Sequence, residues 1–148
     1  MESVLISACL LGVNCKYNGG ANPVSEARLA ALKEKYTLVP VCPESYGGLA
    51  TPRPPSERVG ERVLARDGTD VTAQYEKGAQ AALRLAELFG CKKAILKERS
   101  PSCGRGMIYD GTFSGALTPG DGVTAALLAA HGVAVYGEGD IPRLLEEE

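Results

Sequence analysis

A chain of 148 residues has the length of one domain, and 45% hydrophobic with 23% charged residues is the composition of an ordinary globular protein. Disordered, collagen-like and low-complexity classes are excluded, and we expect residues 1–148 to form a single domain. Sixteen basic and eighteen acidic side chains leave a formal charge of −2, so no net positive field favours bulk binding to nucleic acid. The apolar runs are about half of the roughly 18 residues that a membrane span needs. A signal peptide carries Lys or Arg before its apolar run, whereas Glu2 is the charged residue before the first run of this chain. We therefore expect a cytoplasmic protein with reduced thiols and no membrane contact.

The first third of the chain predicts a strand, a loop, a helix and a second strand. Residues 4–7 are a short apolar run that ends at the Gly- and Asn-rich residues 12–20, which is typical of a buried strand that enters a loop. Asn22 and Pro23 are expected to open a helix whose apolar positions continue to Tyr36. Residues 37–41 then predict the next strand.

The middle of the chain predicts an irregular segment, a hairpin and a long helix. Four prolines exclude a regular element from most of residues 42–58. Residues 63–65 and 69–71 flank an Arg-Asp-Gly turn and predict a hairpin. The apolar face of the following segment predicts a helix that starts near Asp70 or Thr72 and ends at Gly90.

The last third predicts two more strands and one more helix. Residues 93–96 form an apolar strand, and the loop from 97 to 119 is expected to contain a small hairpin around 107–113. Asp121 is expected to cap the next helix, before residues 132–136 give the last strand. Strands that alternate with helices in this way predict an α/β fold, a Rossmann-like three-layer sandwich with a mostly parallel sheet.

Five cysteines are the most informative feature of the composition. Since ligands bind beyond the carboxyl ends of parallel strands, cysteines that follow strands are expected at one rim of the sheet, where they could converge. Cys9, Cys42 and Cys103 meet this condition, whereas Cys91 precedes its strand and is expected to be a buried hydrophobe. Cys15 shares the first loop with Cys9, and a fourth ligand, a resolving thiol and a packing residue all stay open for it. Three thiolates can hold zinc or an iron–sulfur cluster, and residue counts do not choose between them.

The single histidine, His131, stands at the end of the last helical pattern, directly before Gly132. At this position a histidine commonly caps helix carbonyls and complements the helix dipole, so we expect a structural role for it.

Motifs in separate loops resemble the DUF523 family over nearly the whole chain. The residues that carry the resemblance are SACLLGVNCKYNGG at 7–20, CPE at 42–44, GGLATPRPP at 47–55, KERSPSCG at 97–104, YDGTF at 109–113 and GDGVTAAL at 120–127. Members of this family include thiouracil desulfidases, which use a [4Fe-4S] cluster held by three cysteines to remove sulfur from thiolated uracil and release hydrogen sulfide. The resemblance implies that Cys9, Cys42 and Cys103 hold such a cluster.

The resemblance also implies catalytic roles for Glu44 in the Cys-Pro-Glu motif and for Ser100 in the Ser-Pro-Ser-Cys motif. A partly buried Glu44 beside an anionic cluster would be suited to exchange protons near neutral pH, so we expect it to activate the water that replaces the sulfur, without net redox change. Ser100 is expected to donate a hydrogen bond to the substrate or to share in the proton transfer.

The expected substrate is a small thiolated pyrimidine, either 2- or 4-thiouracil or a nucleotide of it. We expect Arg53 and Arg99, together with Arg105, to bind a ring carbonyl or a 5′-phosphate, and Tyr46 or Tyr17 to offer an aromatic surface.

Two other interpretations were weighed. A phosphatase-like Cys-x₅-Arg loop fits poorly, because the sixth residue after Cys9 is Cys15 rather than an arginine. A module that binds a metal or an iron–sulfur cluster for sulfur delivery or sensing, without turnover, uses the same three cysteines and remains the alternative.

Overall fold

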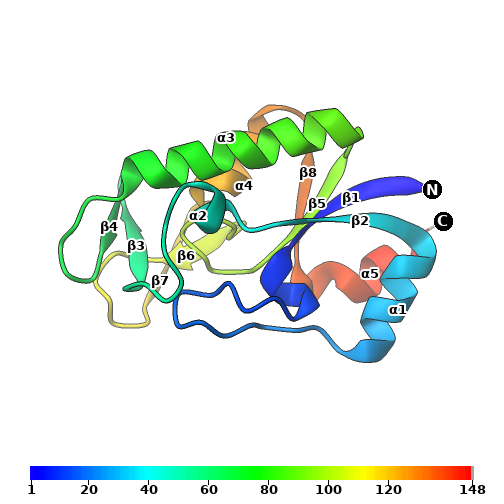
Figure 1. The fold of residues 1–148 in the computed structure, drawn as a ribbon, viewed down its shortest axis with the longest axis horizontal. Helices are drawn as coiled ribbons and strands as arrows, with labels where there is room; N and C mark the ends of the chain where they lie inside the picture. The colour runs from blue at the N-terminus through cyan, green and yellow to red at the C-terminus, as the bar shows by residue number, and fades with distance from the viewer. Residues whose placement is uncertain (148) are drawn as a thin grey trace.

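The structure is a computed structural model that describes residues 1–147, and within them four parallel strands form the central sheet (Figure 1). The strands are β1 (Glu2–Ser7), β2 (Tyr36–Val41), β5 (Lys93–Leu96) and β8 (Ala134–Gly137), in the order β2-β1-β5-β8. All three pairings are parallel, so the four carboxyl ends lie along one edge of the sheet. None of the helices in this part of the chain is long and apolar enough to cross a membrane.

Helices cover both faces of the sheet, because successive residues of a strand point to opposite sides. Val4 and Ile6 pack in one core with α1 (Glu26–Lys35) and α5 (Ile141–Glu146). Leu5 packs in the other core with α3 (Thr72–Phe89) and α4 (Val123–Ala130). Figure 1 shows α3 and α4 on one side of the strands and α1 and α5 on the other. The predicted three-layer α/β fold is confirmed.

Short elements surround the carboxyl edge of the sheet. They are η1 (Ala8–Leu11), α2 (Pro43–Tyr46), the β3–β4 hairpin (Ser56–Val59 and Arg62–Ala65), the β6–β7 hairpin (Met107–Tyr109 and Leu117–Pro119) and η2 (Glu138–Asp140). The two hairpins extend the molecule beyond the strand ends in Figure 1. The segments for which the sequence predicted loops therefore lie mostly at this end of the molecule.

Helix α2 approaches α3 so closely that two glycines are required at the contact. A Cβ at Gly78 of α3 would overlap the carbonyl oxygen of Pro43, and a Cβ at Gly47 would overlap the carbonyl oxygen of Gln74. A glycine inside a helix is unfavourable by itself, so Gly78 is explained by this backbone contact. The contact fixes α2, and the residues around it, against the longest helix.

Several predicted boundaries are wrong. Helix α1 begins at Glu26 because the Ser25 hydroxyl caps it by accepting from Arg28 N (3.3 Å), so Asn22 and Pro23 do not open it, and Tyr36 belongs to β2. The residues that pair with β4 are mainly those of β3, from the segment that was expected to be irregular, while the predicted partner 69–71 makes a single bridge.

The C-terminal third holds two further differences and one agreement. Gly122 is the N-cap of α4, because the Asp121 carboxylate accepts instead from Gly106 N (2.7 Å) and Arg105 Nη1 (2.6 Å). Helix α5 was not predicted. His131 lies at the end of α4 with Nδ1 3.0 Å from the Leu127 carbonyl oxygen, which confirms the capping role expected for it.

Candidate active site

Three cysteines lie at the carboxyl edge of the sheet, each after a different strand. Cys9 is in η1 directly after β1, Cys42 follows β2 as the N-cap of α2, and Cys103 is in the loop after β5. Cys9 and Cys103 are buried, Cys42 is half-buried, and all three are free thiols. The strand pattern predicted that these three cysteines lie at the carboxyl edge of the sheet, and the structure places them there.

Cys9 lies within electrostatic range of both Cys42 and Cys103. Burial raises the pKa of Cys9, and the charge of Cys42 raises it further. Burial raises the pKa of Cys103 to about 12, and the charges of Glu44 and Cys9 act in the same direction, against the hydrogen bonds of Ser7 and Ser102. The raised pKa values keep the Cys9 and Cys103 sulfurs neutral without a bound cation, whereas a coordinating metal deprotonates a thiol outright.

The chemistry of these donors suits an iron–sulfur cluster. Within residues 1–147 no three His, Cys, Asp or Glu side chains lie close enough together to hold one metal ion. An iron–sulfur cluster is held by cysteine thiolates bound to different irons, so its ligands stand farther apart than those of a zinc ion. Three soft sulfur donors after three different strands, two of them buried and one half-buried, are a donor set that suits such a cluster.

The two other cysteines differ in their place. Cys15 is half-buried, its carbonyl oxygen lies 3.8 Å from Cys42 Sγ, and burial followed by the charge of Cys42 raises its pKa to about 12. Cys15 thus lies beside Cys42 and within electrostatic range of Cys9. Cys91 is buried just before β5, in the core between the sheet and α3, and Glu2 at the start of β1 is the charge that acts on its pKa. Cys91 therefore lies at the opposite end of the sheet, as predicted.

A cavity of about 530 Å³ opens at the same edge of the sheet. Both residues with a predicted catalytic role, Glu44 and Ser100, line it. The remaining lining residues are Lys16, Tyr17, Asn22, Pro55, Ser56, Glu57, Arg66, Lys97, Glu98, Pro101, Tyr109, Phe113 and Gly115. The cavity joins the loops after β1, β2 and β5 to both hairpins, and it is larger than a single pyrimidine ring requires.

Glu44 is held by donors on both carboxylate oxygens. Oε2 accepts from Arg53 Nη2 at 2.7 Å, and Oε1 accepts from the Tyr75 hydroxyl. Burial raises the pKa of Tyr75 above its usual range, followed by the effect of the Glu44 charge, so Tyr75 is the donor in this bond. These contacts fix the Glu44 carboxylate in one orientation at the cavity wall.

Arg53 differs from its expected role, because its guanidinium is occupied by the protein. Nη1 donates to the Ala50 carbonyl (3.1 Å) and the Thr51 hydroxyl (3.0 Å), and Nη2 donates to the Cys15 carbonyl (3.1 Å) besides Glu44. Its side chain is only 6% exposed and does not line the cavity. Arg53 thus ties the first loop to the Cys42 loop instead of offering its guanidinium to a ligand.

Ser100 combines a structural contact with a place in the cavity wall. Its hydroxyl oxygen accepts from Ser102 N and Cys103 N, both at 3.1 Å, and so fixes the backbone of the Cys103 loop. Because the oxygen accepts these bonds, its proton remains available for a ligand.

The structure does not bring Tyr46 and Arg99 to the cavity wall. Tyr46 is 43% exposed and its hydroxyl donates to the Pro40 carbonyl (3.4 Å). Arg99 is exposed, with a left-handed backbone at φ 69°. Arg105 pairs with Asp121 and is likewise absent from the wall. The contacts proposed for these residues therefore lack support.

Sequence reasoning missed two parts of the site. Tyr75 belongs to the apolar face from which the sequence predicts α3, and that pattern gives no sign of its bond to Glu44. The available signal is that a buried tyrosine hydroxyl commonly needs a partner. Aromatic rings at the wall come from Tyr17, Tyr109 and Phe113. No periodic pattern in the sequence marks the last two, because they lie on a short hairpin and its loop.

The fold and these residues define a class of protein: an α/β protein with three free cysteine thiols at the carboxyl edge of its sheet and a nearby cavity whose wall carries a fixed carboxylate. The chain belongs to the 2-thiouracil desulfurase family, whose family model matches residues 4–140. This confirms the resemblance seen in the sequence.

Two relatives are similar over almost their whole length. A solved structure of a [4Fe-4S]-dependent thiouracil desulfidase, TudS, superposes with a TM-score of 0.93 at 46% identity, covering 97% of this chain and 95% of that chain. An uncharacterized protein of Bacillus subtilis (strain 168), YbbK, is 41% identical over 152 residues, which is 96% of this chain and 99% of the relative.

Proposed function

We propose that this protein is a [4Fe-4S]-dependent desulfidase that replaces the sulfur of a thiolated pyrimidine by oxygen and releases hydrogen sulfide. The substrate is 2- or 4-thiouracil or a nucleotide of it. We call Cys9, Cys42 and Cys103 at the carboxyl edge of the sheet the rim thiols. The observation that carries the proposal is that the segments bearing them surround a cavity whose wall includes Glu44 and Ser100. Membership in the desulfurase family and the similarity to TudS support the same activity.

In this proposal Cys9, Cys42 and Cys103 hold the cluster, and Cys15 is not a ligand. A cluster with three protein ligands supplies an iron with an open position, a Lewis acid that suits a soft sulfur atom. The protein contributes the position of the substrate, the water and the proton acceptor.

Glu44 takes a proton from the attacking water, which adds to the carbon of the thiocarbonyl group. Collapse of this adduct breaks the carbon–sulfur bond, and the leaving sulfur takes both protons of the water: the one held on Glu44 and then, relayed by Glu44, the hydroxyl proton of the adduct. One water is consumed, one carbonyl and one hydrogen sulfide form, and no electron acceptor or donor takes part. Arg53 and Tyr75 hold Glu44 where it can act, so both are positioning residues in this reaction.

Ser100, which also lines the cavity, donates a hydrogen bond to the substrate from the loop after β5. Lys16 and Lys97 also line the cavity, but Lys97 is paired with Glu138 (2.9 Å), whereas Lys16 donates to the neutral Asn22 side chain (3.1 Å). Lys16 therefore replaces Arg53, Arg99 and Arg105 as the cation that faces a ring carbonyl or a 5′-phosphate.

Anaerobic reconstitution with iron and sulfide, followed by a panel of thiopyrimidines and their nucleotides, tests the proposal. We expect sulfide and the oxo base in equal amounts, without an added reductant. A spectroscopically verified cluster without sulfide release from any compound would refute the enzyme and favour a non-catalytic cluster module for sulfur delivery or sensing. A dependence on added reductant would refute the redox-neutral reaction.

A further inference from the structure

Phe113 has an unusual backbone conformation at the wall of the cavity. Its φ is 57°, in the left-handed region, which is uncommon for a bulky side chain and costs conformational energy. Such a conformation persists only when neighbouring groups impose it, and it is most often found at functional positions. Phe113 is half-buried and lines the same cavity as Glu44 and Ser100.

A buried carboxylate imposes this conformation. Glu57 of β3 is only 8% exposed, and its Oε1 accepts from Gly111 N (2.9 Å) and from Phe113 N (3.1 Å). Burying a carboxylate is unfavourable unless it is well bonded, so the pair of bonds binds the loop after β6 strongly to β3. Glu57 is thus used to hold the backbone that carries Phe113.

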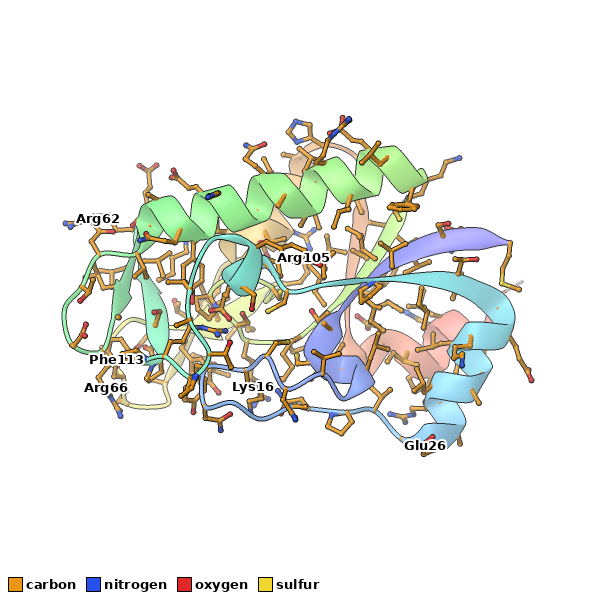
Figure 2. All side chains as sticks on the ribbon, viewed as in Figure 1. Lys16, Glu26, Arg62, Arg66, Arg105 and Phe113 are labelled. Atoms are coloured by element: carbon orange, nitrogen blue, oxygen red, sulfur yellow. The ribbon has the colours of Figure 1, made fainter. Side chains whose placement is uncertain are left out.

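Two further contacts leave the ring little freedom. Gly111 lies against β3 at φ 93°, and a Cβ there would lie 2.8 Å from Val59 Cγ2 and 3.1 Å from the Arg58 carbonyl oxygen. The Arg66 guanidinium lies 5.7 Å from the centre of the Phe113 ring, a cation–π contact. Figure 2 shows Arg66 and Phe113 together at the hairpin end of the molecule. Arg66 therefore occupies one face of the ring.

We propose that Phe113 is a specificity-determining residue. One face of its ring stacks on the conjugated ring of the pyrimidine substrate, and the Arg66 guanidinium lies against the other face. The inference rests on the proposed function and adds to it the surface that selects a flat, conjugated heterocycle. The chain has no tryptophan and only two phenylalanines, and the second, Phe89, is exposed at the end of α3. A ring held at an energetic cost against the cavity is a preorganised surface for a ligand.

A pair of oxo bases tests the stacking directly. Uracil and 5,6-dihydrouracil present the same carbonyl and N–H groups, but only uracil is flat and conjugated. We expect the reconstituted wild-type enzyme to be inhibited by uracil at least about fivefold more strongly than by dihydrouracil, the low end of base–aromatic stacking. In Phe113→Leu this preference should be lost and KM for the thiopyrimidine should rise about fivefold or more, with a smaller change in kcat.

Phe89→Leu is the matched control, because it makes the same substitution at the other phenylalanine and should leave KM and the inhibitor preference unchanged. Phe113→Tyr keeps an aromatic face and should keep the preference. If Phe113→Leu retains both the wild-type KM and the uracil preference, the inference is overturned. A purely structural role would lower the thermal stability of Phe113→Leu without removing the preference of the folded enzyme for uracil, and that result also overturns it.

A fluorescence measurement separates the inference from the proposed function. Because the chain has no tryptophan, Phe113→Trp and Phe89→Trp each carry a single tryptophan. We expect uracil to quench the emission of Phe113→Trp in a saturable way and to leave Phe89→Trp unchanged. Quenching in a protein that releases no sulfide would refute the desulfidase and support the stacking surface, whereas equal behaviour of the two variants would refute the surface alone.

Discussion

Replacing Arg53 by methionine isolates the bond network that orders the candidate active site. The substitution removes the ion pair with Glu44 and the bonds to the carbonyl oxygens of Cys15 and Ala50, while it keeps an apolar stem of similar length. The Arg53 side chain is 6% exposed and the Glu44 side chain is 21% exposed. Solvent therefore screens the charge of Arg53 very little and the charge of Glu44 partly.

The expected loss of stability follows from this burial. Removing one partner of a fully buried pair costs about 3–5 kcal/mol, and the partial exposure of Glu44 places the expected cost near the lower limit, at about 3 kcal/mol. For a chain of this size each kcal/mol corresponds to about 2–4 °C, so the melting temperature should fall by about 6–12 °C. The melting temperature of Arg53→Lys should lie between those of the wild type and Arg53→Met. Its ammonium keeps a charge near Glu44 but lacks the planar guanidinium that donates to Glu44 and to the Cys15 carbonyl together.

Arg62→Met is a matched control. Arg62 Nη2 lies 2.7 Å from Asp70 Oδ2, the same distance as in the Arg53–Glu44 pair, but its side chain is 66% exposed. Exposed pairs contribute little, so this variant should melt with the wild type. The assay is thermal unfolding of reconstituted protein, followed by circular dichroism without oxygen. If Arg53→Met melts within about 2 °C of Arg62→Met, the reasoning from burial is wrong.

Four further predictions concern the site. Alanine substitution should abolish iron binding after reconstitution at each of the three rim thiols: Cys9, Cys42 and Cys103. Iron analysis should find normal loading in Cys91→Ala and also in Cys15→Ala, where loss of iron would make Cys15 a fourth ligand and leave no open iron. Glu44→Gln should keep the cluster spectrum but lower kcat by about 10² or more, the effect of losing a general base, and near-normal turnover would exclude the role. Tyr75→Phe removes a bond to a charged group of about 1.5–3 kcal/mol, so kcat should fall by about tenfold to 100-fold with KM nearly unchanged, and an equal change in both would indicate a different role. Gly78→Ala should destabilise the protein by about 1–3 kcal/mol, measured by urea unfolding, because the new Cβ overlaps the Pro43 carbonyl, whereas an unhindered helix would be stabilised.

The strands and the rim thiols could be predicted because their signals are local. Each strand is a short apolar run, and the end at which a cysteine follows it determines the edge of the sheet on which it lies. Cys91 and Cys103 were separated in this way on opposite sides of β5. Glu44 and Ser100 came from the resemblance, and the structure places both at the cavity wall.

Side-chain pairing between distant segments could not be predicted. Arg53 meets the Cys15 carbonyl across 38 residues, and Tyr75 meets Glu44 across 31 residues. Asp121 has the local signature of an N-cap, but Gly106 and Arg105 use its carboxylate, since the β6–β7 hairpin brings them to it. A single sequence contains the donors and acceptors and does not show which of them the fold brings together.

The ties made by Arg53 and Ser100 have a consequence for how the protein matures. Arg53 connects the loops of Cys15 and Cys42, and Ser100 fixes the backbone of the Cys103 loop, through bonds of the chain itself and without a metal. Folding can then precede cofactor insertion, and the empty protein presents its thiols already gathered at one edge of the sheet. In the proposed enzyme such a site takes up a cluster without refolding of the chain, so the protein without iron should be folded, colourless and inactive.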